Sequence, residues 1–90
     1  MKKYEELQLT DQKQEALTIL MEECAEVIQE CSKILRFDCD TESLTKEISD
    51  MMVMIEILER KNLLKSSQIE EFMENKRKKL KKYSLLDEFL

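Results

Sequence analysis

The sequence predicts an all-α fold, with the whole chain, residues 1–90, forming one helical domain. The chain contains no glycine and no proline, so it lacks the residues that usually make tight hairpin turns. Its apolar residues recur at steps of three and four over long stretches, which is the spacing of amphipathic helices. A chain of this length buries only about 60% of its unfolded surface. We therefore expect a helical bundle that is completed by oligomerisation.

The first helix is expected to begin at Thr10 or Asp11, because Asp11 is followed by Gln14 in the arrangement of a capping box. It should continue to about Phe37. Its apolar side chains alternate steps of four and three, the pattern by which one helix packs along another. The predicted contact positions are Leu17, Met21, Cys24, Ile28, Cys31 and Leu35.

The second helix is expected to follow a short break, with Asp40 and Thr41 as N-cap candidates, and to run to about Lys61. Asn62 is the candidate C-cap, because asparagine tolerates the left-handed conformation. Apolar residues surround this helix almost completely: Leu44, Ile48, Met51, Met52, Val53, Met54, Ile55, Ile57 and Leu58. A helix that is apolar on every side is normally enclosed by protein, so we expect it to contact a second subunit.

The third helix is expected to open at Ser67, which forms a capping-box pattern with Glu70, and to run to about Lys82. The two ends of the chain are less defined. Residues 1–9 fit either a short helix or a strap over the bundle, and the apolar residues of 83–90 fit either a contact with a neighbour or a frayed end.

Composition excludes several classes of function. The net charge is −5, with 39% charged residues, so we expect a soluble cytoplasmic protein that does not bind nucleic acid through its overall charge. The lack of glycine argues against P-loop and dinucleotide-binding motifs. We expect no membrane span and no signal peptide. The three cysteines lack zinc-site spacing, and Cys24 and Cys31 are interpreted as small core residues in a reducing compartment.

Two pairs of carboxylates lie within the apolar helical runs, Glu23 with Glu26 and Glu47 with Asp50. Residues three apart lie on the same side of a helix, with Cβ atoms about 5–6 Å apart, so each pair can reach a common ion. The short break between the two helices favours antiparallel packing, which brings the pairs face to face. Because four ionised carboxylates repel one another unless a cation is present, the sequence predicts a metal site.

The spacing of these pairs is weak evidence alone, because 15 residues of the chain are glutamate. Two further pairs repeat it on helix faces that solvent would cover: Glu56 with Glu59, and Glu71 with Glu74. The Glu-x-x-Asp pattern, however, occurs once, at Glu47 and Asp50. It directly precedes the most apolar run of the chain, where idle acids are costly to hold against a core.

The donor set restricts the metal. The chain has no histidine, whereas a ferritin-type di-iron centre normally uses a Glu-x-x-His pattern. Carboxylate oxygens suit Mg²⁺, Mn²⁺ or Ca²⁺. Mg²⁺ usually keeps several waters and completes its coordination with substrate phosphate. We therefore expect Mg²⁺, with Mn²⁺ as a substitute, and phosphate chemistry.

The two-part pattern also resembles a known family. Residues 22–26, Glu-Glu-Cys-Ala-Glu, are followed after twenty residues by Glu-Ile-Ser-Asp at 47–50 and then by an apolar helix. This resembles the MazG-like nucleoside triphosphate pyrophosphohydrolases of the all-α NTP pyrophosphatase superfamily, whose signature is Glu-x-x-Glu, a variable gap, and Glu-x-x-Asp. The resemblance covers about residues 12–83. It is specific for the superfamily but not for a substrate.

The resemblance implies a helical bundle assembled as a dimer or a dimer of dimers. It implies Mg²⁺ on Glu23, Glu26, Glu47 and Asp50, and hydrolysis between the α- and β-phosphates of a nucleoside triphosphate to give a monophosphate and pyrophosphate. The expected role is nucleotide-pool house-cleaning. A carboxylate that is not fully engaged by metal would serve as general base, and Glu22 and Glu26 are the candidates.

A basic run on the third helix is the candidate phosphate-binding segment. Family members commonly carry lysine and asparagine on a later helix, and Asn75, Lys76 and Arg77 stand at the comparable place. Glutamates stand just before Asn75, where a lysine is expected, so the phosphate role can pass to Lys76, Arg77 or Lys79. The alternatives are a solvated helix end favoured by the helix dipole and a nucleic-acid site, which would lack stacking aromatics apart from Tyr83.

Two other functions fit the same sequence. Phosphoribosyl-ATP pyrophosphohydrolase shares the acidic pattern and the reaction type, and a non-enzymatic helical interaction module would carry the acids as ordinary surface residues. The base of a nucleotide substrate is not specified, because the chain is poor in aromatic residues and none of the candidates, Tyr4, Phe37 and Phe72, is distinctive.

Overall fold

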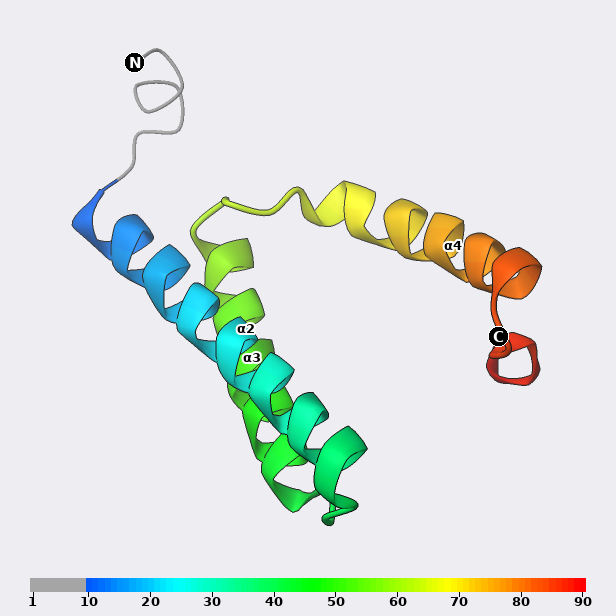
Figure 1. The fold of residues 1–90 in the computed structure, drawn as a ribbon. Helices are drawn as coiled ribbons and strands as arrows, with labels where there is room; N and C mark the ends of the chain where they lie inside the picture. The colour runs from blue at the N-terminus through cyan, green and yellow to red at the C-terminus, as the bar shows by residue number, and fades with distance from the viewer. Residues whose placement is uncertain (1–9) are drawn as a thin grey trace.

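The computed structural model describes residues 10–90, and these residues form an all-α structure with no strand. Three α-helices and a short 3₁₀ helix follow one another: α2 (Asp11–Phe37), α3 (Glu42–Arg60), α4 (Ser66–Tyr83) and η1 (Asp87–Phe89) (Figure 1). The predicted all-α class is thus confirmed over this range. The two alternatives for residues 1–9 lie outside the described residues.

The bounds of α2 follow from its two ends. Thr10 is the N-cap, and its hydroxyl oxygen accepts a hydrogen bond from the Lys13 backbone N–H at 3.2 Å, so Thr10 rather than Asp11 caps the helix. At the other end Asp38 adopts a left-handed conformation with φ of 52°, and its N–H donates to the Ile34 carbonyl at 3.1 Å. That bond satisfies a carbonyl that the last turn would leave unpaired.

The ends of α3 are also close to those predicted. The Asp40 carboxylate accepts from the Glu42 N–H at 3.0 Å, just ahead of the first turn. Asn62 has φ of 60°, which confirms its predicted left-handed role. The Asn62 N–H donates to the Glu59 carbonyl and the Leu63 N–H to the Leu58 carbonyl, at 3.1 and 2.9 Å. These two bonds form a Schellman motif in which asparagine stands where glycine is usual.

The start of α4 differs from the prediction. The helix begins at Ser66 after Lys65 as N-cap, and no side chain accepts a hydrogen bond there, so the predicted Ser67–Glu70 capping box is wrong. The Ser66 hydroxyl instead donates to the Glu59 carboxylate at 3.3 Å, at the end of α3. The serine therefore links consecutive helices rather than capping its own.

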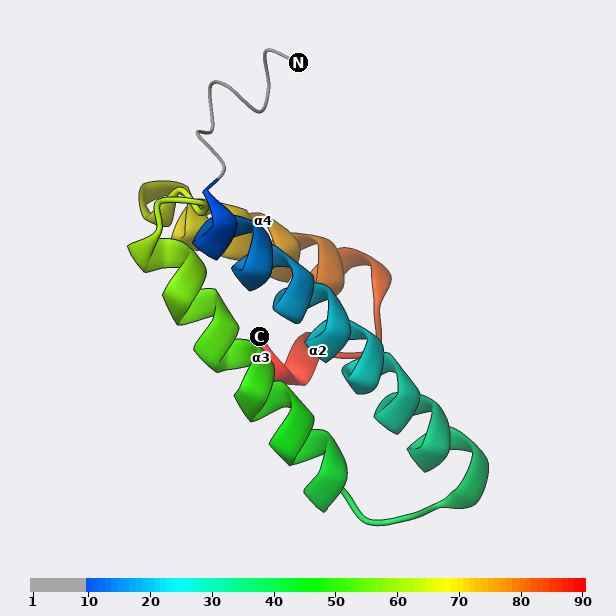
Figure 2. The ribbon, with the colours of Figure 1, turned by 90° about the vertical axis from the view of Figure 1, so that its left-hand side faces the viewer.

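The helices α2 and α3 pack antiparallel as a hairpin, while α4 leaves it at an angle (Figures 1 and 2). A small core lies at the open end of the hairpin, opposite the connection of residues 38–41, and consists of Ala16, Met54 and Leu58, with Leu58 only 1% exposed. An apolar groove of about 420 Å³ separates α3 from α4. It is lined by Met52, Ile55, Glu56, Glu59, Ile69 and Met73.

The face of α2 that contacts α3 is the predicted one only in part, because Leu17 and Cys24 face the hairpin but the other predicted positions do not. Met21, Ile28 and Leu35 are 66%, 70% and 87% exposed, and Cys31 is exposed as well. The less exposed stripe consists of Ala16, Leu20, Glu23, Val27, Glu30 and Ile34. It has the same alternating steps as the predicted one but lies elsewhere on the helix. Cys31 lies outside this stripe and is exposed, so its interpretation as a core residue is wrong. Two glutamates, Glu23 and Glu30, belong to the stripe.

Cys24 does fit its predicted environment better than Cys31. It is half-buried, and its Sγ lies 3.9 Å from the Met51 Sδ across the hairpin. On α3, Met52 and Val53 are more than half exposed, so the apolar surface around this helix is only partly covered by its own chain. Among residues 10–90, no helix has both the length and the apolarity to cross a bilayer.

Candidate metal site

Three carboxylates meet between α2 and α3, beyond the core and toward the connection between the helices. Glu23 and Glu26 project from one side of α2 and Glu47 projects from α3, and one oxygen of each lies within 4.8 Å of the others. The three-residue spacing places the α2 pair on a common side, and antiparallel packing brings Glu47 opposite them. The predicted meeting of the two helices' acids is therefore found for three of the four residues.

Two of these carboxylates are largely enclosed. The Glu47 side chain is 15% exposed, and the Oε2 atoms of Glu23 and Glu47 are buried without a hydrogen-bond partner among the described residues. Buried polar atoms are nearly always satisfied in folded proteins. An unpaired carboxylate oxygen in such a position needs either a proton or a cation. Both atoms thus point to a group that the protein chain itself does not supply.

The electrostatics of the cluster agree with this interpretation. A hydrogen bond shared with Glu47, together with the negative charge of that carboxylate, raises the pKa of Glu26 to about 7. Burial raises the pKa of Glu23, and the charges of Asp50 and Glu47 raise it further. Glu26 therefore resists full ionisation near neutral pH unless a cation is bound beside it.

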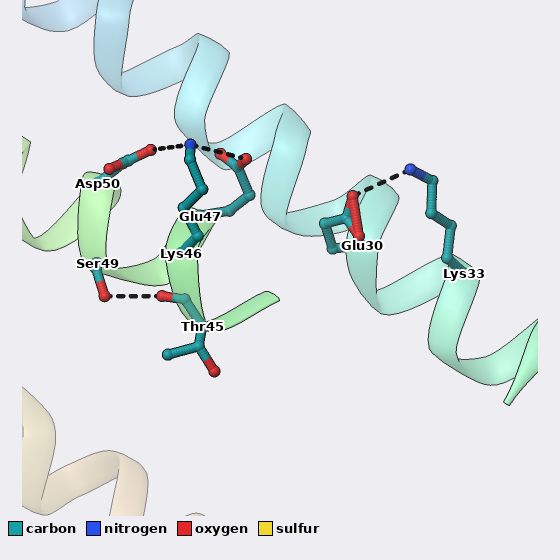
Figure 3. Close-up of polar contacts among 7 residues, drawn as sticks. All are labelled: Glu30, Lys33, Thr45, Lys46, Glu47, Ser49 and Asp50. Atoms are coloured by element: carbon teal, nitrogen blue, oxygen red, sulfur yellow. Dashed lines mark hydrogen bonds and ion pairs between the residues drawn. The ribbon is translucent and has the colours of Figure 1, made fainter. Parts of the chain in front are cut away.

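Asp50, the fourth predicted ligand, is held by a neighbour instead. Lys46 Nζ lies 3.0 Å from the Asp50 carboxylate and 3.6 Å from that of Glu47 (Figure 3). Hydrogen bonding to Asp50, followed by the charges of Asp50 and Glu47, raises the pKa of Lys46. The Asp50 oxygens are not part of the convergent group, although the charge of Asp50 acts on Glu23. Asp50 therefore lies beside the site, paired with a lysine.

The residues present fit a hard divalent cation. Three carboxylate oxygens can occupy part of an octahedral coordination shell, and the remaining positions would be left for water and phosphate. Neither imidazole nor thiolate joins the group, which disfavours zinc and the softer transition metals. The two orphaned oxygens are those that a cation would satisfy.

The other predicted site residues lie elsewhere. Glu22 is exposed on α2 and is not part of the convergent group. Asn75, Lys76 and Lys79 are exposed on α4, which departs from the opposite end of α3 (Figure 1). Arg77 forms ion pairs within its own helix, with Glu70 at 2.9 Å and Glu74 at 3.0 Å. A single chain therefore does not bring the basic run to the carboxylates.

Lys46 is the contact that sequence reasoning missed. It stands four residues before Asp50, the separation at which oppositely charged side chains of a helix meet, so the signal was available. Lys33 and Glu30 form a comparable ion pair at 3.1 Å on α2 (Figure 3). Of these two lysines, Lys46 contacts a carboxylate that converges with the others and Lys33 does not.

Comparison with protein-family models, with curated proteins and with solved structures found no match to this chain. Inferences about function therefore depend on the sequence pattern and on the geometry of the carboxylates.

Proposed function

We propose that the protein is a Mg²⁺-dependent nucleoside triphosphate pyrophosphohydrolase, which cleaves a ribo- or deoxyribonucleoside triphosphate to the monophosphate and pyrophosphate. The observation that carries the proposal is the meeting of Glu23, Glu26 and Glu47 with two buried oxygens unsatisfied. The MazG-like spacing of the acids supports the reaction type. A role in nucleotide-pool house-cleaning follows from that resemblance.

The carboxylates of the chain would have different roles in this reaction. Glu23, Glu26 and Glu47 would hold Mg²⁺, and Asp50 would join them on leaving Lys46. When bound, the ion would neutralise phosphate charge and lower the pKa of a coordinated water. Glu26 is more exposed than Glu23 and Glu47, so it has room to accept a proton from a water molecule and is the better candidate for general base. Glu22, which is exposed and outside the group, is the alternative.

Assembly into a dimer or a tetramer is part of the proposal. Large apolar side chains are exposed on all three α-helices of the described chain, among them Ile28, Met52 and Phe72. A chain of this length has only a limited core of its own, so we infer that contacts with other chains cover these side chains. A neighbouring subunit would cover them, and its α4 would offer Lys76, Arg77 or Lys79 to the phosphates that this chain's own α4 does not reach.

The decisive experiment measures pyrophosphate release from a panel of NTPs and dNTPs, with phosphoribosyl-ATP included, in the presence of Mg²⁺. We expect pyrophosphate from at least one substrate, loss of activity in Glu47→Gln, and normal activity in Glu71→Gln, which changes an exposed glutamate on α4. Direct release of orthophosphate, or no turnover of any compound, would contradict the proposal.

A helical interaction module is the second candidate, favoured by the exposed apolar residues after α4. Leu85 is 99% exposed and Phe89 is 75% exposed. If the panel gave no turnover and Glu47→Gln left metal-free stability unchanged, the acids would be ordinary surface residues and this second function would be preferred.

A further inference from the structure

The structure holds one lysine against the proposed metal site, and its position has a function beyond that of a surface ion pair. Lys46 lies on α3 immediately before Glu47 and one turn before Asp50. Its ammonium group contacts the carboxylates of both residues, at 3.6 and 3.0 Å. Its charge therefore lies between Asp50 and Glu47, which belongs to the convergent group (Figure 3).

We propose that Lys46 is a tethered counter-cation that competes with the metal ion: it holds Asp50 away from the ligand group in the metal-free protein, and a metal must displace it to acquire Asp50. This inference rests on the proposed function, because it assumes that the carboxylates bind a metal. It also explains why Asp50 is the one predicted ligand whose oxygens do not converge with the rest.

The exchange requires little rearrangement. The Lys46 side chain is 69% exposed and that of Asp50 is 43% exposed, so both can rotate without disturbing the core. A lysine ammonium is a compact charge on a flexible stem and is readily rehydrated. Glu47, in contrast, is fixed by burial and keeps its orphaned oxygen inside. The mobile part of the site is therefore the Lys46–Asp50 pair.

The charges explain why a counter-cation is useful. One carboxylate oxygen of each of Glu23, Glu26 and Glu47 lies within 4.8 Å of the others, and Asp50 adds a further negative charge one turn after Glu47. One ammonium group offsets part of this charge, while a divalent cation offsets more and binds more oxygens. The lysine would thus stabilise the metal-free protein and lower the apparent affinity for the metal, since the metal has to break an existing ion pair.

The experiment titrates Mg²⁺ and Mn²⁺ by calorimetry into wild type, Lys46→Met, Lys46→Arg and the control Lys33→Met, and records metal-free melting temperatures in EDTA. Lys33 forms an equivalent ion pair with Glu30 but does not contact the convergent group. We expect Lys46→Met to bind metal about tenfold more tightly, the scale of removing one positive charge beside a divalent ion in water, and to melt at a lower temperature without metal.

Lys46→Arg should change metal affinity in the opposite direction. A guanidinium group binds carboxylates through two parallel hydrogen bonds, so it should hold Asp50 more firmly than lysine does and weaken metal binding. A lysine with only a structural role would not produce opposite changes in the two variants. Lys33→Met should bind metal as wild type does.

Two results would overturn the inference, and they differ in what they leave standing. If wild type binds metal and Lys46→Met binds it with the same affinity as Lys33→Met, the lysine does not compete, while the proposed function is retained. If neither wild type nor Lys46→Met binds metal, and Glu47→Gln leaves the metal-free melting temperature unchanged, the metal site itself is rejected together with the inference.

Discussion

The two ends of the α2–α3 hairpin differ in the side chains that lie in the contact between the helices. At the open end, Ala16 packs against Met54 and Leu58 and excludes water. Toward the closed end, positions of the same α2 stripe carry Glu23 and Glu30, and Glu47 stands opposite on α3. One end is thus held by apolar burial, which needs no ligand, whereas the other gathers negative charge. The difference shows how one pair of helices can place charged residues together while a separate apolar core stabilises the packing of the same helices.

The largest expected effect lies at the apolar end. Leu58 is the most deeply buried residue of the small core. Leu58→Ala should reduce the free energy of unfolding by about 2–5 kcal/mol, because it removes buried apolar atoms from the core and leaves a cavity. Urea denaturation followed by circular dichroism measures this. Val53→Ala, at a position 53% exposed, is the matched control and should have a much smaller effect. Equal losses in the two variants would show that the core is elsewhere.

The next effect belongs to the acidic end. At a Mg²⁺ concentration of about 100 times Kd, binding to the folded state alone should add about 2.7 kcal/mol to the free energy of unfolding. The melting temperature of wild type should therefore rise with Mg²⁺, and that of Glu47→Gln should not. Leu58→Ala, if folded, should keep the full Mg²⁺ response because its change lies outside the acidic cluster. A response retained in Glu47→Gln would contradict the ligand assignment.

The pH dependence of the metal-free protein gives a smaller effect. The pKa of Glu26 is raised from its ordinary value of 4.5 to about 7, so the folded state binds this proton more tightly than the unfolded state does. The resulting stability is complete below about pH 4.5 and is lost as pH rises toward 7 and above. Melting temperatures in EDTA should fall over this window more in wild type than in Glu26→Gln. Parallel curves for the two proteins would be evidence against the shared proton.

The smallest effect is expected at the ion pair nearest the closed end. Lys33 and Glu30 are three residues apart on α2, and the Lys33 side chain is 47% exposed. Pairs of this kind contribute about 0.2–1 kcal/mol, so Lys33→Met should lower the free energy of unfolding by no more than this amount. High salt should remove most of the difference, because it screens exposed charges. A larger, salt-independent loss would mean that Glu30 belongs to the buried cluster.

Local signals in the sequence were sufficient for the helices and for most of the acidic cluster. The left-handed role of Asn62 and the bounds of α2 follow from short-range rules that the structure obeys. The contact face of α2 was predicted only in part, because apolar periodicity assigns the inward side to hydrophobic residues. Here Glu23 and Glu30 turn inward, while Met21 and Ile28 turn outward. A site that places charge in a helix contact violates the pattern from which such contacts are predicted.

The direction of α4 and the pairing of Asp50 with Lys46 were also not predicted from the sequence. The direction of α4 depends on the connection after Asn62 and on surfaces that its own chain does not cover, so no local pattern specifies it. The Lys46–Asp50 pair was readable from the spacing of the two residues. The spacing of Glu47 and Asp50 predicts a different pairing equally well, and only the three-dimensional arrangement shows that Asp50 is paired with Lys46.

The connection between α2 and α3, residues 38–41, has a consequence for the order of folding. A short closed loop has a low entropic cost, and contacts between neighbouring helices form quickly. The acids of α2 and α3 therefore meet early, before the chain has gained all of its stabilising contacts, and their repulsion opposes that step. Mg²⁺ should then accelerate refolding of wild type in stopped-flow experiments, but not refolding of Glu47→Gln. The cation would thus assist the folding of the hairpin as well as the proposed reaction.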